Sequence, residues 1–119
     1  MSEAIRTAIA TAASTVDGVT VTPYYRQVMT PGQGMVRMDR TVYPDPFGGI
    51  TTWQVCIVVP QALADSEKWL EAKQDELVDA IGSELIIRTV IPKELVVQDP
   101  QKNPVSVPVV VIEGERGPE

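Results

Sequence analysis

The side chains that could carry out catalysis are few, and their spacing brings no nucleophile and base together. The chain contains no histidine, which excludes Ser-His-Asp and Cys-His arrangements and histidine-ligated metal sites. Cys56 is the single cysteine and lies within an apolar run. A reactive thiol needs an electropositive, partly exposed setting. We therefore interpret Cys56 as a buried structural residue.

Two further patterns fall short of known catalytic or nucleotide sites. Asp75 and Asp79 are one helical turn apart, but acid–base catalysis by such a pair needs a cleft that separates their pKa values. We expect them on a solvated acidic surface instead. Gly32-Gln33-Gly34 is followed by a strand pattern and lacks the third glycine, or the Lys-Ser/Thr pair, of a phosphate-binding loop. The residues therefore predict no enzyme and no cofactor.

Arginines and aromatic side chains gather in one stretch of the chain. This mixture is typical of protein interfaces and of nucleic-acid stacking patches. The net charge of −6 argues against nucleic acid, because proteins that bind the phosphate backbone cluster Lys and Arg. We predict a subunit or partner interface, with an ordinary surface hairpin as the alternative. Its candidate residues are Tyr24, Tyr25, Arg37, Arg40, Tyr43 and Phe47.

The strongest structural signal is an apolar strand at 53–59 that Pro60 ends. Alternation divides its side chains between two faces. Because both faces are apolar near the end of the strand, we predict a central strand covered on both sides there. One face carries Trp53, Val55, Ile57 and Val59, and the other carries Gln54, Cys56 and Val58.

The best helical pattern follows at 63–81, with Asp65 or Ser66 as the predicted N-cap and Gly82 as the end. Leu70, Leu77 and Ile81 belong to its apolar stripe. The opposite surface is predicted to be strongly acidic, because six acidic side chains face only two lysines there. These are Asp65, Glu67, Glu71, Asp75, Glu76 and Asp79 against Lys68 and Lys73.

The N-terminal part predicts a helix capped by Ser2, with an alanine-rich apolar face that continues to Val16 and lies close against a sheet. A turn at Asp17-Gly18 and a strand at 19–22 follow. A strand at 35–43 lies between Pro- and Gly-rich clusters. We predict that residues 26–49 form a projecting hairpin or arm; the alternative is a segment without fixed structure until assembly.

The C-terminal part predicts a strand at 85–91 ended by Pro92, with a short continuation at 94–98 and a loop at 99–104. The last strand, at 105–112, contains Pro108 and should therefore be an edge strand or carry a bulge. Residues 113–119 are expected to be a flexible polar tail. The predicted fold is α+β, with two helices packed on a mixed, mostly antiparallel sheet.

Composition sets the remaining limits. A length of 119 residues with 44% hydrophobic residues fits a single domain over 1–119 with its own core. We see no signal peptide and no apolar run of the ~20 residues that span a bilayer. One cysteine excludes an internal disulfide. We expect a protein that is made and used in the cytosol, or built into a structure assembled there, with no membrane partner.

The layout from about Ile5 to Ile112 resembles the tail terminator proteins of long-tailed, siphovirus-type bacteriophages. The features that carry the resemblance are the alanine-rich first helix followed by residues 16–21, the Pro- and Gly-broken hairpin, the strand 53–59 with Pro60, the acidic helix, and closing strands with Pro104 and Pro108. The stopper and head-completion proteins of the same neck region have related folds, so another head–tail connector protein is the alternative within this class.

The resemblance implies a structural virion protein of the tail or neck, assembled in the host cytoplasm. Such proteins form a homo-oligomeric ring of six subunits that caps the tail tube, ends tube polymerisation and docks to the head. The implied partners are the chain itself, the tail tube protein and a connector or stopper protein. DNA passes through without specific binding. On this view the residues that could face the channel are Asp65, Glu71, Asp75 and Asp79.

The sequence also leaves open a hypothesis from a different functional class. A small cytosolic ligand-binding α+β domain would hold an apolar ligand between helix and sheet, near Trp53 and Trp69. Such a domain should contain a pocket of a few hundred Å³.

Overall fold

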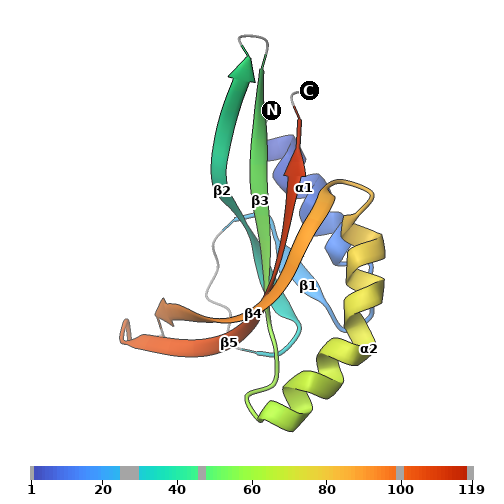
Figure 1. The fold of residues 1–119 in the computed structure, drawn as a ribbon. Coiled ribbons are helices and arrows are strands. Elements are labelled where there is room, and N and C mark those ends of the chain that lie inside the picture. Colours follow the sequence, from blue (N-terminus) through green and yellow to red (C-terminus); the bar gives the residue numbers. More distant parts are fainter. Residues whose placement is uncertain (1, 25–29, 46–47, 99–100, 118–119) are drawn as a thin grey trace.

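A computed structural model describes residues 2–24, 30–45, 48–98 and 101–117. It contains two helices and five strands (Figure 1). The principal extents of the molecule are 46 × 32 × 20 Å. In chain order the elements are α1 (Ser2–Ala13), β1 (Thr20–Thr22), β2 (Gln33–Asp45), β3 (Gly48–Val58), α2 (Leu63–Ile81), β4 (Ile86–Gln98) and β5 (Pro104–Arg116).

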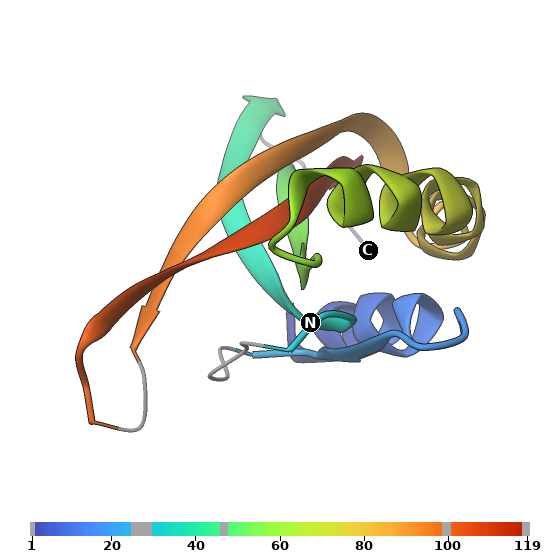
Figure 2. The same cartoon turned by 90° about the horizontal axis from the view of Figure 1, so that it is seen from below.

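The strands form one mixed sheet in the order β1-β2-β3-β5-β4. β1 and β2 are parallel, and the other three pairs are antiparallel. The predicted α+β class and the mostly antiparallel sheet are therefore confirmed. Both helices lie on the same side of the sheet (Figure 2). We call that side the helix face and the opposite side the helix-free face.

The main core lies between the helix face and the two helices. Trp53, Val55, Ile57 and Val59 point into it, as their alternation along the chain predicts, together with residues such as Ile9, Leu77, Ile81 and Ile112. On the helix-free face, β3 and β5 contribute to a second apolar cluster, and the far end of the β4–β5 hairpin supplies Val97 and Val107. The prediction of a central strand with apolar contacts on both faces is confirmed.

The α2 helix has the predicted bounds, but its beginning differs in detail. Gly82 follows its last turn and donates its N–H to carbonyl oxygens of that turn. The predicted N-cap, Asp65 or Ser66, is wrong: Ala62 occupies the cap position and no side chain caps the helix. Asp65 lies in the first turn of the helix, where its negative charge interacts favourably with the helix dipole.

The α1 helix ends at Ala13, earlier than the apolar pattern predicts. Val16 nevertheless reaches the core from the turn that follows. In that turn the hydroxyl of Ser14 accepts a hydrogen bond from the N–H of Val21 (2.9 Å). This bond joins the end of α1 to β1, so the turn residues behave as part of the core although they are not helical.

Pro92 does not end the strand at 85–91, contrary to expectation. β4 runs through it as one strand of 13 residues and pairs with β5 along its whole length. The physical reason is its position: β4 is an edge strand, where a residue without an N–H can face away from the ladder. The short continuation expected at 94–98 is the second half of this same strand.

β5 is also longer than expected, and it is not an edge strand. It lies between β3 and β4 and runs from Pro104 to Arg116. Pro108 is tolerated because it stands where β3 leaves the sheet: its carbonyl oxygen accepts the N–H of Val59 (3.0 Å), and Pro60 then turns the chain away. Residues 113–116, expected in a flexible tail, are paired with β3 and β4 instead.

The projecting arm expected at 26–49 is not confirmed. β2 pairs with β3 from Gly34 to Asp45, and β1 covers its first residues, Gln33–Met35. The expected loop at 44–49 is replaced by strands that run to Asp45 and restart at Gly48. Residues 25–29 and 46–47 lie outside the described part. β5 pairs with β3 as far as Thr51, so the β2–β3 hairpin is two-stranded from the Val42–Ile50 pair outward. This end reaches past β5 in Figure 1.

We expect Gly32→Ala to lower the free energy of unfolding by about 2–4 kcal/mol. Gly32 has a φ of 92°, and an added Cβ would overlap the carbonyl oxygen of Gly18. Its N–H also donates to Val58 O (2.9 Å), so the backbone cannot move freely. Urea unfolding measures the loss. Gly117→Ala, where an added Cβ meets nothing within 4 Å, is the control, and an equal loss in both variants would contradict the prediction.

Candidate interaction surfaces

Arg6 forms the most elaborate polar contact in the described structure. Its guanidinium lies 4.7 Å from the ring centroid of Tyr24 and 5.3 Å from that of Trp53. Its Nη1 donates to the carbonyl oxygens of Pro23 (3.0 Å) and Val36 (3.1 Å). Cation–π contacts of this kind stabilise most when they are shielded from water. Arg6 therefore ties α1 to β2 and to the segment after β1.

Arg6 was not among the predicted interface residues. A usable signal exists: Arg6 stands four residues before Ala10 and seven before Ala13, so it shares the side of α1 that those buried alanines occupy. This contact also gives Tyr24, a predicted interface residue, a role inside the subunit. Half of the Tyr24 side chain remains exposed, so the ring can also meet a partner.

The predicted interface residues do not form one patch. Arg37 and Arg40 point from the helix-free face, because their register partners Gln54 and Thr52 share the face of Cys56. Tyr43 lies on the helix face at the far end of the β2–β3 hairpin, against Gly49. Tyr25 and Phe47 lie outside the described residues. The structure therefore separates the four candidates that it describes instead of gathering them.

Large apolar side chains are exposed at the ends of both hairpins. Tyr43 is 73% exposed at the end of β2–β3, beside the half-exposed Val42, and Val96 is 67% exposed at the end of β4–β5. A Cβ added to Gly49 would lie 2.9 Å from Cε1 of Tyr43, so the ring rests on the glycine backbone. Tyrosine in such a supported, exposed position is typical of protein interfaces.

The outer surface of α2 carries a row of carboxylates. Glu67, Glu71, Asp75 and Asp79 follow one another at steps of four residues and are all exposed. None of them has an ion pair within 4.0 Å in the described part of the chain. We call these four residues the acidic stripe. It includes three of the four residues predicted to face a channel; the fourth, Asp65, is exposed on the first turn of the same helix.

The basic residues of β2 and β4 all stand on the helix-free face. Arg40 is paired with Asp39 (3.1 Å) and Arg88 with Glu115 (3.5 Å). Arg37 and Lys93 are exposed and have no carboxylate within 4.0 Å among the described residues. Each stands two residues along its strand from the residue in line with Cys56, which is Met35 on β2 and Ile91 on β4, so both lie around the middle of that face.

Cys56 is buried, as expected for a structural cysteine. Burial raises the pKa of its thiol, and the charges of Arg37 and Lys93 oppose that rise only in part. A raised pKa in the folded state means that the thiol contributes stability below its unfolded pKa and loses that contribution as pH rises through the folded value.

We therefore expect the unfolding free energy of the wild type to fall above about pH 8.5, by at most about 1.4 kcal/mol per pH unit from this thiol. Cys56→Val should lack that part of the alkaline loss, because it keeps the apolar volume and removes the ionisable group. Urea unfolding from pH 7 to 10 gives the difference. Parallel curves for the two proteins would show that Cys56 ionises equally well when folded.

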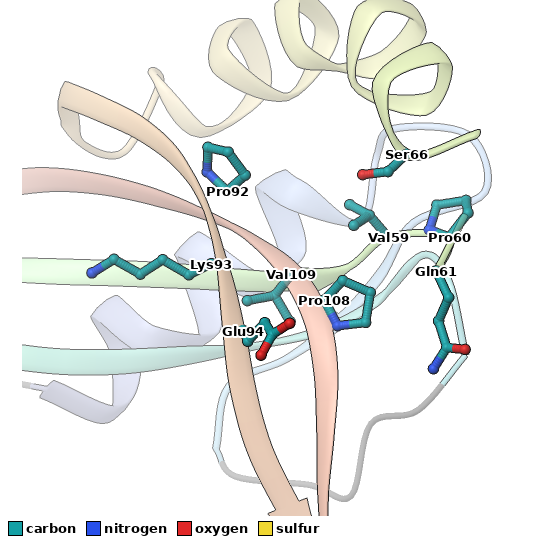
Figure 3. Close-up of a pocket in the computed structure, with 9 residues that line it drawn as sticks. All are labelled: Val59, Pro60, Gln61, Ser66, Pro92, Lys93, Glu94, Pro108 and Val109. Atoms are coloured by element: carbon teal, nitrogen blue, oxygen red, sulfur yellow. The ribbon is translucent and has the colours of Figure 1, made fainter. Parts of the chain in front are cut away.

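A hollow of about 350 Å³ lies between the start of α2 and the β4–β5 hairpin (Figure 3). Val59 and Val109 form part of its apolar lining, and Lys93 and Glu94 are polar lining residues. This volume would suit a small ligand, but the place differs from the one expected: Trp53 is 2% exposed within the main core. The three prolines of its lining are Pro60, Pro92 and Pro108.

The described residues contain no group of three or more side chains that could hold a metal ion. Among the helices of that same part, none is long and apolar enough to cross a membrane. Comparison with protein-family models finds no match, and comparison with curated proteins finds none either.

Proposed function

We propose that the chain is a structural virion protein of a long-tailed phage, a tail terminator that forms a ring, with six subunits as the expected number. The proposal starts from the resemblance described above. The observation that supports it best is the pair of exposed apolar hairpin ends, Tyr43 with Val42 on one and Val96 on the other. A subunit that contacts several neighbours needs such surfaces at separate places.

The arrangement of the hairpins favours contacts in more than one direction. The β2–β3 end and the β4–β5 end lie at different extremities of the molecule (Figure 1). At each end the hairpin consists of two strands only: β5 does not reach the end of β2–β3, and β3 does not reach the end of β4–β5. In a ring, one surface of each subunit meets a different surface of the next. The remaining hairpin surface is then free to contact the tail tube protein or a connector protein.

The charge of the chain suits a protein through which DNA passes without specific binding. The net charge is −6, and repulsion acts over about 8 Å at physiological salt. In a ring, the carboxylates of Asp65, Glu71, Asp75 and Asp79 have two possible places. They could line the channel, where they repel DNA phosphates, or they could meet a neighbouring subunit. On either arrangement the protein belongs to the virion and is assembled in the host cytoplasm.

Two other functions compete with this proposal. A stopper or another head–tail connector protein would use the same exposed hairpin ends, with different partners. A ligand-binding domain would instead use the hollow beside Pro60, Pro92 and Pro108. A ligand that occupies this hollow should raise the melting temperature further as its concentration rises above Kd, whereas a ring protein gains stability from its own concentration.

The test is native mass spectrometry with negative-stain imaging over a concentration series, with and without purified tail tubes. The proposal predicts closed rings in solution or a single ring at one end of each tube. Tubes should also stop growing when the protein is added. A protein that stays monomeric, leaves tube ends bare and does not change tube length would rule the proposal out.

A further inference from the structure

Neither edge of the sheet offers an easy place for a neighbouring strand. β1 has only three residues and covers only Gln33–Met35 of β2. From Val36 to Asp45 β2 is therefore an edge itself, and there it carries Arg37, Asp39, Arg40 and a register shift between Met38 and Arg40. β4 is long, but its ladder is interrupted between Ile87 and Thr89, and it carries Pro92 and Lys93 in its middle. Bulges, prolines and lysines on an edge strand are the devices that prevent strand addition. A contact between subunits is therefore expected to use the faces of the molecule rather than its edges.

The acidic stripe of α2 needs a partner that the subunit does not supply. Its four carboxylates follow one another one helical turn apart, and each like-charge neighbour of this kind weakens a helix. The only lysine of α2 with a described contact, Lys73, donates to the carbonyl oxygen of Asp17 (2.8 Å) and not to a carboxylate. The stripe is about 18 Å long, given the rise of 1.5 Å per residue.

The helix-free face offers two cations for such a contact, and it also carries Glu113, whose Oε2 accepts a hydrogen bond from Gln54 (3.1 Å). Arg37 and Lys93 stand on it without carboxylate partners among the described residues, on strands β2 and β4. These strands are three inter-strand spacings apart, or about 14 Å, and Lys93 lies four residues along β4 from Thr89, which is in register with Arg37, or about 13 Å further along the strand. The two backbone positions are thus about 19 Å apart, close to the length of the stripe. The same face exposes Val42, Ile86 and Ile91, so a helix placed across it would also cover apolar surface.

We infer that the acidic stripe of one copy of this chain binds the helix-free face of the next copy, across Arg37 and Lys93. The inference rests on the proposed ring. The two surfaces point in opposite directions within one subunit, because α2 covers the helix face (Figure 2). Two stripes would repel one another in a twofold contact, so the charges favour a head-to-tail contact, the kind that generates rings. The stripe would then be absent from the channel lining.

Two variants with opposite defects test the contact. The helix variant carries Glu71→Lys and Asp75→Lys, and the sheet variant carries Arg37→Glu and Lys93→Glu. All four positions are exposed, and thermal unfolding verifies that both variants fold. Each variant alone would face like charges at every contact, so we expect at least a tenfold loss of rings. Mixed in equal amounts, the two should form alternating rings with equal numbers of each, which native mass spectrometry identifies by mass.

Matched controls change the same charge elsewhere. Glu3→Lys with Glu76→Lys, and Lys68→Glu with Lys102→Glu, leave the stripe and the helix-free face intact and should form rings as the wild type does. Rings that persist in the helix and sheet variants would overturn the contact while leaving the ring proposal in place. A mixture that fails to assemble would also overturn it. Absence of rings in the wild type, even on tube ends, would end both proposals.

Discussion

Trp53→Ala is expected to lower the free energy of unfolding by about 3–5 kcal/mol, the range for removing a large aromatic side chain from a core. Trp53 is 2% exposed and stands in the main core beneath the helices. The substitution also removes one of the two rings beside the guanidinium of Arg6. Because domains of this size are stable by about 5–15 kcal/mol, we expect Trp53→Ala to be partly unfolded near its working temperature. Urea unfolding followed by circular dichroism measures the loss.

Trp53→Phe separates apolar packing from the polar part of the indole. The Nε1 of Trp53 is buried and has no hydrogen-bond partner in the described structure, which is an unfavourable state for a donor. Phenylalanine removes that donor and keeps a ring against Arg6, so the expected loss is below about 1.5 kcal/mol. A loss as large as that of the alanine variant would contradict this prediction and show that the full indole is needed to fill the core.

Some of the fold follows from local sequence pattern. The bounds of α2 were predictable because an apolar stripe with helical spacing lies between Pro60 and Gly82, and each of these residues limits the helix. The two faces of β3 were predictable because side chains alternate in any strand. In both elements the burial of a residue depends on its immediate neighbours in the sequence, which the sequence displays directly.

The β4–β5 hairpin shows what local pattern leaves undetermined. Pro92 has the same chemistry in every strand, but it ends an inner strand and is tolerated in an edge strand. Pro108 was expected in an edge strand or at a bulge but lies in an inner strand. It is tolerated there because the neighbouring strand β3 has ended at that point. Whether a proline interrupts a strand thus depends on which strands lie beside it, and that order is a property of the whole sheet.

Which residues share a candidate surface depends on how the strands pair, because pairing brings together residues that are far apart in the sequence. The acidic stripe was visible in the sequence, because its carboxylates share one helix. The two cations on the opposite side were not, because Arg37 and Lys93 share one face only through the pairing of β2, β3, β5 and β4. The role of Arg6 was hidden for the same reason: its partners, Tyr24 and Trp53, come from segments far along the chain.

The second large effect is expected on assembly and not on folding. Val42→Ser with Tyr43→Ser should weaken the contacts of the β2–β3 hairpin end by at least about thirtyfold, since an interface tyrosine that acts as a hot spot contributes 2 kcal/mol or more. Stability should change by less than about 0.5 kcal/mol, because both side chains are at least half exposed. The readout is the fraction of tail-tube ends that carry a ring, together with the concentration at which free rings form.

Two further variants show which hairpin end and which part of the tyrosine are responsible for the loss of assembly. Tyr43→Phe keeps the ring on Gly49 and should assemble within about threefold of the wild type if apolar contact carries the interaction. Val96→Ser tests the other hairpin end, where 67% of the side chain is exposed. If rings form in solution but fail to bind tubes in only one of these variants, that hairpin end is the tube-binding surface. If both serine variants assemble and cap tubes normally, the exposed hairpin ends are not contact surfaces, and the main structural support for the ring proposal is lost.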